Sequence, residues 1–419
     1  MFLFLSLASS QGLGSSSVQG AFGAVTIDGK IWNQVALRPI IPIGKVSVAL
    51  DIVFYIDQNG NVHDDEWDFS DGKKSKNSII DKIYYIRYGK KWDPFYFQVG
   101  ALDNVTLGKG ILVNRYTNTI LYPQVRKVGM DIKFKVSGFN FYGFTNDFKE
   151  NLGLTGFRVS KNIINGINIG GSLVADRNQY LGLRDSDNDG RPDLVDDFPD
   201  DPLYWLDTDG DGIADVDPNE LDIDGDGVTD TLDSNIPGWD LDSIYVLDTD
   251  IMRKPEPLNV QNRKRSIYAV SLDASRTILA ESNMSVSIYA QFASLIGKTV
   301  DPISAEEVSL GNGFIPFGLS TKLGPARFKF EYRMMPSGKF EFGYWDRSYE
   351  IERATFSSSF MNDNSGLRTG EIITKDSRLG KFGKQKGYFS TLSIDLGEMV
   401  GASMSYQNLF GEQWNENEN

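Results

Sequence analysis

The sequence predicts an all-β fold, an antiparallel up-and-down transmembrane β-barrel of about 14–16 strands with one irregular insertion. Three observations predict it. Apolar and polar residues alternate with a period of two, as on a strand with one apolar face. The alternating runs last about 9–11 residues, which is longer than most soluble strands and suits a tilted strand that crosses a bilayer. Short connections between the runs alternate with long polar ones.

Fifteen runs have the strand pattern. In Val128–Val136, for example, apolar residues stand at the even positions and Gly129, Asp131, Lys133 and Lys135 at the odd ones. The expected strands span 18–28, 30–41, 45–56, 78–88, 94–102, 127–136, 138–147, 153–160, 165–177, 265–275, 283–295, 311–321, 326–335, 386–397 and 400–410.

An odd strand count is unusual, because bacterial single-chain barrels have even numbers. Segment 337–386 is long enough to hold two more strands, and Leu107–Tyr116 is either another strand or a loop folded inward. The chain ends in the polar stretch Trp414–Asn419 rather than in an aromatic strand. We therefore expect a sequence that is cut at its C-terminal end.

The polar face of two expected strands is basic. Its cations are Lys133, Lys135, Arg327, Lys329 and Arg333. The simpler interpretation is that these side chains line a wet interior, and an anion-preferring pore is the alternative.

The connections sort into two kinds. Short turns occur at 42–45, 89–93, 137–139, 160–166, 322–325 and 397–401, whereas long connections span 57–77, 103–126, 177–265, 297–311 and 337–386. Outer-membrane barrels have short periplasmic turns, long outer loops and aromatic girdles at both interfaces. The 7 Trp, 18 Tyr and 26 Phe, several of them near strand ends, agree with such girdles. The longest connection should then lie outside the cell.

That longest connection repeats one acidic pattern three times, starting at Asp185, Asp207 and Asp222. Each copy has aspartates at positions 1, 3, 5 and 9 and a glycine at position 6. Calcium takes six to eight oxygen ligands, and a tight loop supplies them at this spacing, with a carboxylate at position 12. We predict calcium as the cofactor. The candidate ligands are Asp185, Asp187, Asp189, Asp193, Asp196, Asp207, Asp209, Asp211, Asp215, Asp222, Asp224, Asp226, Asp230 and Asp233.

Position 12 differs between the copies. Asp196 and Asp233 occupy it in the first and third, whereas the second has Pro218, so its last ligand should be Asp217 or a water. An EF-hand is disfavoured because position 12 is never Glu and prolines break the flanking segments. A solvated acidic linker is the plain alternative, and the repeated spacing disfavours it.

The three copies resemble the thrombospondin type 3 repeat, whose pattern is DxDxDGxxDxxD. This resemblance covers 185–233 and implies calcium-filled loops with little hydrophobic core, hence a structural module. The rest of the chain resembles outer-membrane barrels of the porin type in architecture, without a diagnostic motif.

Composition limits the function further. The net charge is −15, but 185–250 holds 23 acidic residues against one basic residue, Arg191, so the remainder is at +7. The acidic segment disfavours nucleic acid and would repel itself without cations.

The absence of cysteine excludes disulfides and thiolate sites. The single histidine, His63, is expected in a solvated loop, and no Walker loop or GxSxG motif is present, so we do not expect an enzyme.

The expected organisation is a truncated signal segment at 1–11, barrel strands at 18–177, the calcium-binding insertion at 178–264 and barrel strands again at 265–419. We predict a porin-like channel or surface scaffold in contact with outer-membrane lipid. Its calcium module should be exposed at the cell surface, where a surface or matrix ligand is the expected partner. The alternative is a secreted calcium-dependent adhesion or matrix protein of β-sandwich domains. Anchorage to the cell wall is disfavoured, because strands resume after residue 265.

Overall fold

The computed structural model describes residues 17–27, 30–61, 82–122, 125–230, 251–300, 306–360, 368–396 and 400–413. His63, Asp233 and the expected signal segment 1–11 lie outside them. The chain divides into two compact units. The first comprises residues 1–176, 267–349 and 379–419, and the second comprises 177–266 and 350–378.

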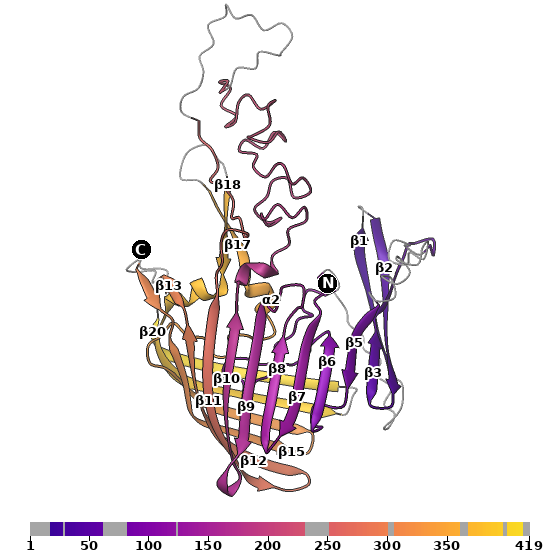
Figure 1. Ribbon diagram of the computed structural model, residues 1–419, viewed down its shortest axis with the longest axis vertical. Helices are drawn as coiled ribbons and strands as arrows, with labels where there is room; N and C mark the ends of the chain where they lie inside the picture. The colour runs from indigo at the N-terminus through magenta and orange to yellow at the C-terminus, as the bar shows by residue number, and fades with distance from the viewer. Residues whose placement is uncertain are drawn as a thin grey trace, which may run out of the picture. The chain divides into compact units, whose positions relative to one another are not determined.

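Sixteen strands form one antiparallel sheet in the described part of the first unit. They are β1 (Ser17–Ile27), β2 (Lys30–Ile43), β3 (Val46–Leu50), β4 (Ile52–Ile56), β5 (Ile83–Tyr88), β6 (Phe95–Gly100), β7 (Gly129–Val136), β8 (Phe139–Thr145), β9 (Leu154–Asn162), β10 (Ile167–Asp176), β11 (Ile267–Ala280), β12 (Met284–Ile296), β15 (Asn312–Leu323), β16 (Ala326–Met335), β19 (Phe382–Leu396) and β20 (Val400–Gln413). Sheet neighbours follow one another along the chain, as the adjacent strands β6 to β10 show in Figure 1. The all-β, antiparallel up-and-down fold is therefore confirmed.

The expected run 45–56 forms two strands, β3 and β4, which both pair with β2 in one continuous register. The interruption falls at Asp51, which is buried and stands opposite Arg38. Nε of Arg38 lies 2.6 Å from Oδ1 of Asp51, and the Asp51 N–H donates to the Lys82 carbonyl. Since β3 and β4 share one partner, the order of strands across the sheet has fifteen positions, from β1 to β20, with β4 outside it and paired to β2.

Because neighbouring strands run in opposite directions, their connections fall at the two ends of the sheet. One end carries short turns, such as 44–45, 137–138 and 324–325. At 137–138 both residues, Ser137 and Gly138, have positive φ, as the tight hairpin turns of twisted strands require. The other end carries the long connections 57–82, 101–128, 177–266, 297–311 and 336–381. The predicted sorting of short and long connections is thus present in the sheet.

The two faces of this sheet have the reverse of the usual polarity. On β11, Leu272 is 62% exposed while its neighbour Asp273 is only 6% exposed. On β16, Phe328 is exposed while Glu331 and Arg333 are buried. In most soluble proteins, charged side chains are exposed and large apolar side chains are buried. Here the reverse holds, and buried charges alternate with exposed apolar side chains along the strands. Apolar residues on the exposed face include Ile86, Tyr88, Phe157, Ile169, Leu173, Tyr268, Leu272, Ile278, Ile288, Phe328, Leu392, Met404, Tyr406 and Phe410.

Two long connections fold onto the polar face of the sheet. Residues of 101–118 and 340–349 join side chains of β8, β9, β10, β11, β12, β15 and β16 in one buried hydrophobic cluster. The two connections also bond to each other: the Trp345 N–H donates to the Leu112 carbonyl and the Asn114 N–H to the Trp345 carbonyl, both at 3.0 Å. Segment Leu107–Tyr116 is therefore an inward-folded loop and not a barrel strand.

The remaining elements are short. They are β13 (Lys298–Val300), β14 (Glu307–Ser309), β17 (Ala354–Phe360), β18 (Arg368–Thr374), α2 (Tyr349–Glu352) and the 3-10 helices η1 (Ile164–Gly166), η2 (Gln179–Gly182) and η3 (Lys375–Lys381). Segment 337–386 contains two strands, β17 and β18, but among the described residues they pair only with each other, and β16 pairs directly with β19. Among the described residues, no helix is long and apolar enough to span a membrane.

Within the second unit, the described residues of 177–266 have little regular structure, and buried polar groups join the two ends of this insertion to residues 350–378. Asp376 accepts hydrogen bonds from Gln179 Nε2 and Arg265 Nε, each at 2.8 Å. Arg353 is buried and donates to the Asn178 carbonyl at 3.1 Å. Residues 350–378 thereby hold both ends of the insertion together.

Candidate metal centre

The three acidic loops of the second unit have the same backbone path. In each, the carboxylate at position 1 accepts the N–H of the glycine at position 6. The pairs are Asp185 with Gly190 at 3.0 Å, Asp207 with Gly212 at 2.9 Å and Asp222 with Gly227 at 2.8 Å. These glycines have φ values of 95°, 93° and 90°, a conformation that side chains with a Cβ rarely adopt. Glycine at position 6 therefore allows each loop to turn back onto its first aspartate.

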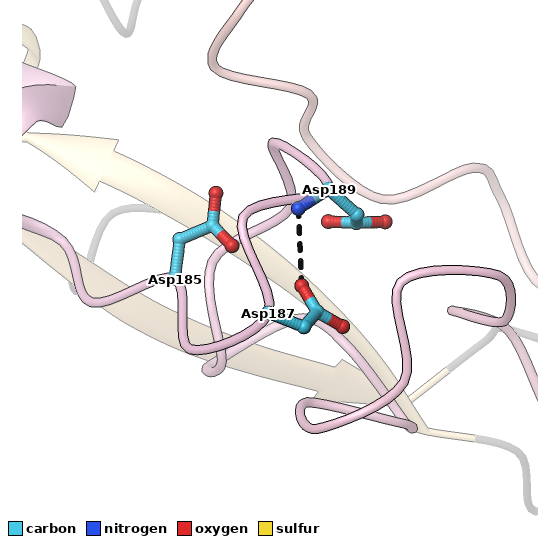
Figure 2. A group of neighbouring side chains, drawn as sticks. All are labelled: Asp185, Asp187 and Asp189. Carbon is cyan, nitrogen blue, oxygen red and sulfur yellow. Dashed lines mark hydrogen bonds between the residues drawn. The ribbon is translucent and has the colours of Figure 1, made fainter.

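The aspartates at positions 1, 3 and 5 of each loop come together. The trios are Asp185, Asp187 and Asp189; Asp207, Asp209 and Asp211; and Asp222, Asp224 and Asp226. Within each trio, one oxygen of every carboxylate lies within 4.8 Å of the others. Two oxygens that bind one calcium at 2.3–2.6 Å are at most about 5 Å apart, so each trio has the dimensions of a calcium site. Figure 2 shows the first trio, in which the Asp189 N–H donates to the Asp187 carboxylate.

The aspartates at position 9 lie outside these trios and close the loops. Oδ1 of Asp193 accepts the Ser186 N–H at 2.7 Å, and Oδ1 of Asp215 accepts the Thr208 N–H at the same distance. Asp230 likewise accepts the Ile223 N–H. Each loop thus uses its fourth aspartate to bind the amide at position 2, which fixes the loop that presents the trio.

Asp196, at position 12 of the first loop, lies beside the first trio. It is 8% exposed, and its Oδ2 takes no hydrogen bond from the described residues, nor does the buried Oδ2 of Asp187. The pKa of Asp196 is raised to about 6, mainly by burial and also by the negative charges of Asp189 and Asp187. The hydrogen bond from the Phe198 N–H acts in the opposite direction. Buried acceptor oxygens without a donor, next to other carboxylates, are the arrangement that a bound cation would satisfy.

The second loop uses an acid that the sequence pattern did not indicate. Glu220 is 6% exposed, and its Oε1 accepts the Asp222 N–H at 2.8 Å. Its pKa is raised by burial and by the charges of the nearby Asp211 and Asp209 of the second trio. Asp217, the expected candidate, instead accepts the Asn219 N–H at 2.8 Å, and this bond lowers its pKa. Glu220 follows position 12 by two residues. A search for acids at position 12 alone therefore misses it, and a search that allowed this shift would have found it.

The third loop is described only as far as residue 230. The buried Oδ1 of Asp222 takes no hydrogen bond from the described residues. Oδ2 of Asp224 accepts the Met252 N–H at 2.9 Å. The position-12 residue, Asp233, lies outside the described residues.

A returning segment, 251–262, runs along the loops and bonds to each of them. Besides the bond to the third loop, the Lys254 N–H donates to Thr208 Oγ1 of the second loop at 3.1 Å. The Val260 N–H donates to the Gly190 carbonyl of the first at 2.8 Å. The guanidinium of Arg191 stacks 3.7 Å from the ring centre of Trp205. These contacts set the loops in a row.

No family model matches the chain, and no curated protein matches it. Solved structures that align with it include a mutant of the Rhodopseudomonas blastica porin, at 9% identity, 93% coverage of both chains and a TM-score of 0.30. Pseudomonas aeruginosa OccK10 aligns at 7% identity, covering 94% of this chain and 76% of that one, with a TM-score of 0.29. A variant of OmpT, a Vibrio cholerae outer membrane protein, aligns at 6% identity, 97% and 91% coverage and a TM-score of 0.32. Likeness at this level decides nothing about function, which has to rest on the residues of this chain.

Proposed function

We propose that the first unit is a porin-like outer-membrane β-barrel and that the second is a calcium-stabilised module at the cell surface, without enzymatic activity. The observation that carries the first part is the reversed polarity of the sheet. Its exposed face is lined by Leu173, Leu272 and Met404, and its other face buries Asp273 and Glu331. An apolar surface that extends over many strands would drive aggregation in water, whereas lipid covers it at no cost.

The sorting of connections supports the orientation of this barrel. The insertion joins β10 to β11 at the end that carries the long connections. In outer-membrane barrels that end faces the outside of the cell. A single sheet of sixteen strands also favours a barrel over the secreted β-sandwich alternative, which needs two packed sheets.

Envelope fractionation tests the barrel. We expect the chain in the outer-membrane fraction, extractable only with detergent, and migrating faster on a gel before boiling than after it. A closed, hydrogen-bonded sheet resists the detergent until it is heated, which is the physical cause of the shift. Recovery in a soluble or secreted fraction without any shift would contradict the proposal.

Calcium binding by the second unit is supported by the trio dimensions and by the buried oxygens of Asp187, Asp196 and Asp222 that take no hydrogen bond from the described residues. In the first loop, Asp196 would join the trio, and in the second loop Glu220 would. Calcium would neutralise carboxylates that otherwise repel one another and would stiffen a unit with little apolar core. Extracellular calcium modules bind at about 0.1–1 mM, which is the affinity we expect here.

The substitution Glu220→Gln should weaken the second calcium site on the order of tenfold, because it removes a charged oxygen ligand from beside Asp209 and Asp211. Asp217→Asn, three residues earlier, is the matched control and should change little, since Asp217 bonds to Asn219. Calcium titration of the detergent-solubilised chain measures both. Equal weakening by the two variants would refute the assignment of Glu220.

A further inference from the structure

The two larger of three cavities that border the inward-folded segment 101–118 in the described part of the first unit contain lysine and arginine side chains. One, of about 470 Å³, lies against β7, β8 and β9 and is lined in part by Thr106 and Gly108. The other, of about 600 Å³, lies against β16, β19 and β20 and is lined in part by Asn104, Asn114 and Arg115. The second cavity therefore lies on the polar face of the sheet. The first is lined from both faces of β7 and β8, by Lys133 and Tyr142 on the polar face and by Phe134 and Phe141 on the other.

The linings of these cavities are positively charged. The first contains Lys91, Lys133, Lys135, Arg158 and one acid, Asp93, and the second contains Arg115, Arg327 and Lys329 and no acid. Three further acids pair with lining cations: Asp131 with Lys91, Asp273 with Arg158 and Glu331 with Lys329. The two linings together thus contain seven basic residues and one acidic residue, and the three further acids lie beside three of these cations. A cleft with one sign of charge and low-dielectric walls concentrates ions of the opposite sign.

The second cavity also carries a patch of hydroxyl groups. Thr391 and Ser393 of β19 stand opposite Ser405 and Ser403 of β20, and all four line the cavity. Hydroxyl groups that can donate hydrogen bonds, placed beside guanidinium and ammonium groups, are the donor set that binds phosphate and carboxylate oxygens.

Arg115 is held at this cavity by the backbone. Its φ is +59°, a conformation that non-glycine residues seldom adopt, and its N–H donates to Thr106 Oγ1 at 3.0 Å. Its Nε donates to Asn104 Oδ1, and Asn104 also has a positive φ. The loop tip is fixed in turn by Lys329, whose Nζ donates to the Lys109 carbonyl at 2.9 Å. Strained residues that are fixed in this way are concentrated at binding sites.

We propose that the second cavity is a binding subsite for small oxyanions, that is, phosphate or carboxylate groups, and that the two cavities together give the barrel a preference for anions. The proposal rests on the proposed barrel function and adds the class of solute. Rings of Arg and Lys side chains select anions and phosphate in pores of other proteins.

Reversal potentials of the purified full chain in planar bilayers under a KCl gradient test this proposal. We expect an anion-selective value that shifts toward zero in the double variant R115Q/R327Q and stays in R115K/R327K. The control is Arg276→Gln, at an exposed position of β11 outside both linings. Inorganic phosphate should lower the conductance of the native chain and not that of R115Q/R327Q. Cation selectivity, or no shift in the double variant, would overturn the proposal.

Failure of the channel itself remains distinguishable from failure of the subsite. If the chain inserts and shows the heat-dependent gel shift but carries no current, the channel function is wrong. The subsite is then judged by equilibrium binding of inorganic phosphate to the detergent-solubilised chain. Binding that is lost in R115Q/R327Q supports the subsite, and the absence of binding to the native chain overturns it. The gel shift of each variant identifies one that has failed to fold.

Discussion

Removal of calcium with a chelator should open the second unit to proteolysis about a hundredfold faster while the first unit stays intact. Two carboxylates 4.8 Å apart repel each other by about 1 kcal/mol even in water, and each trio contains three such pairs. A trio without a cation is thus destabilised by about 3 kcal/mol, which corresponds to roughly a hundredfold in the open population. Few apolar side chains oppose this, because the buried ones of the loops are Leu206, Ala214 and Ile223 in the described residues.

Limited digestion with chymotrypsin measures this effect, since Tyr204 and Trp205 lie between the first two loops. Restored calcium should restore resistance, whereas magnesium at the same concentration should restore less, because magnesium dehydrates reluctantly and prefers fewer protein ligands. Heat-dependent migration of the barrel should be the same with and without chelator. Equal cleavage rates under all conditions would show that the loops keep their folded structure without a bound ion. That result would contradict the calcium proposal.

The sheet could be predicted because one physical rule governs each strand. Successive residues of a strand point to opposite faces. In Ala326–Met334 apolar and polar residues alternate, so the sequence shows which residues belong to each face. The predicted range 326–335 matches β16, and its predicted inward set, Arg327, Lys329 and Arg333, lies on the face that carries the buried Glu331. No knowledge of the neighbouring strands was needed for this step.

The inward loop and the complete metal sites depend on contacts that a local pattern does not contain. Segment 101–118 lacks a period, and its place is set by distant partners such as Trp345 and Gln291. The loop pattern did predict the trios, because the aspartates that form them and the glycine that turns the loop all lie within nine consecutive residues. It could not give Glu220, because the chain between Asp215 and Glu220 takes a turn of its own. Nor could it show that the aspartates at position 9 bind backbone amides.

The substitution Glu331→Gln should destabilise the barrel by about 3–5 kcal/mol, the largest effect we expect from a single side chain. Glu331 is fully buried on the polar face and accepts a hydrogen bond from the Tyr289 hydroxyl at 2.8 Å. Its carboxylate also lies 2.7 Å from Lys329 Nζ and 2.6 Å from Arg333 Nη2. The neutral amide would leave two cations buried without their common counter-charge, and that uncompensated charge is what makes breaking a buried pair costly.

Glu307→Gln is the matched control, because Glu307 forms an exposed ion pair with Lys298 at 3.0 Å. Exposed pairs contribute about 0–1 kcal/mol, since water screens both charges. Urea unfolding of the two variants in the same detergent should therefore shift the midpoint strongly for Glu331→Gln and barely for Glu307→Gln. Equal shifts would mean that water reaches Glu331 as freely as Glu307, and the buried charges under the inward loop would then be solvated. That result would also weaken the argument for concentrated positive potential in the cavities, because the same low-dielectric surroundings are responsible for both effects.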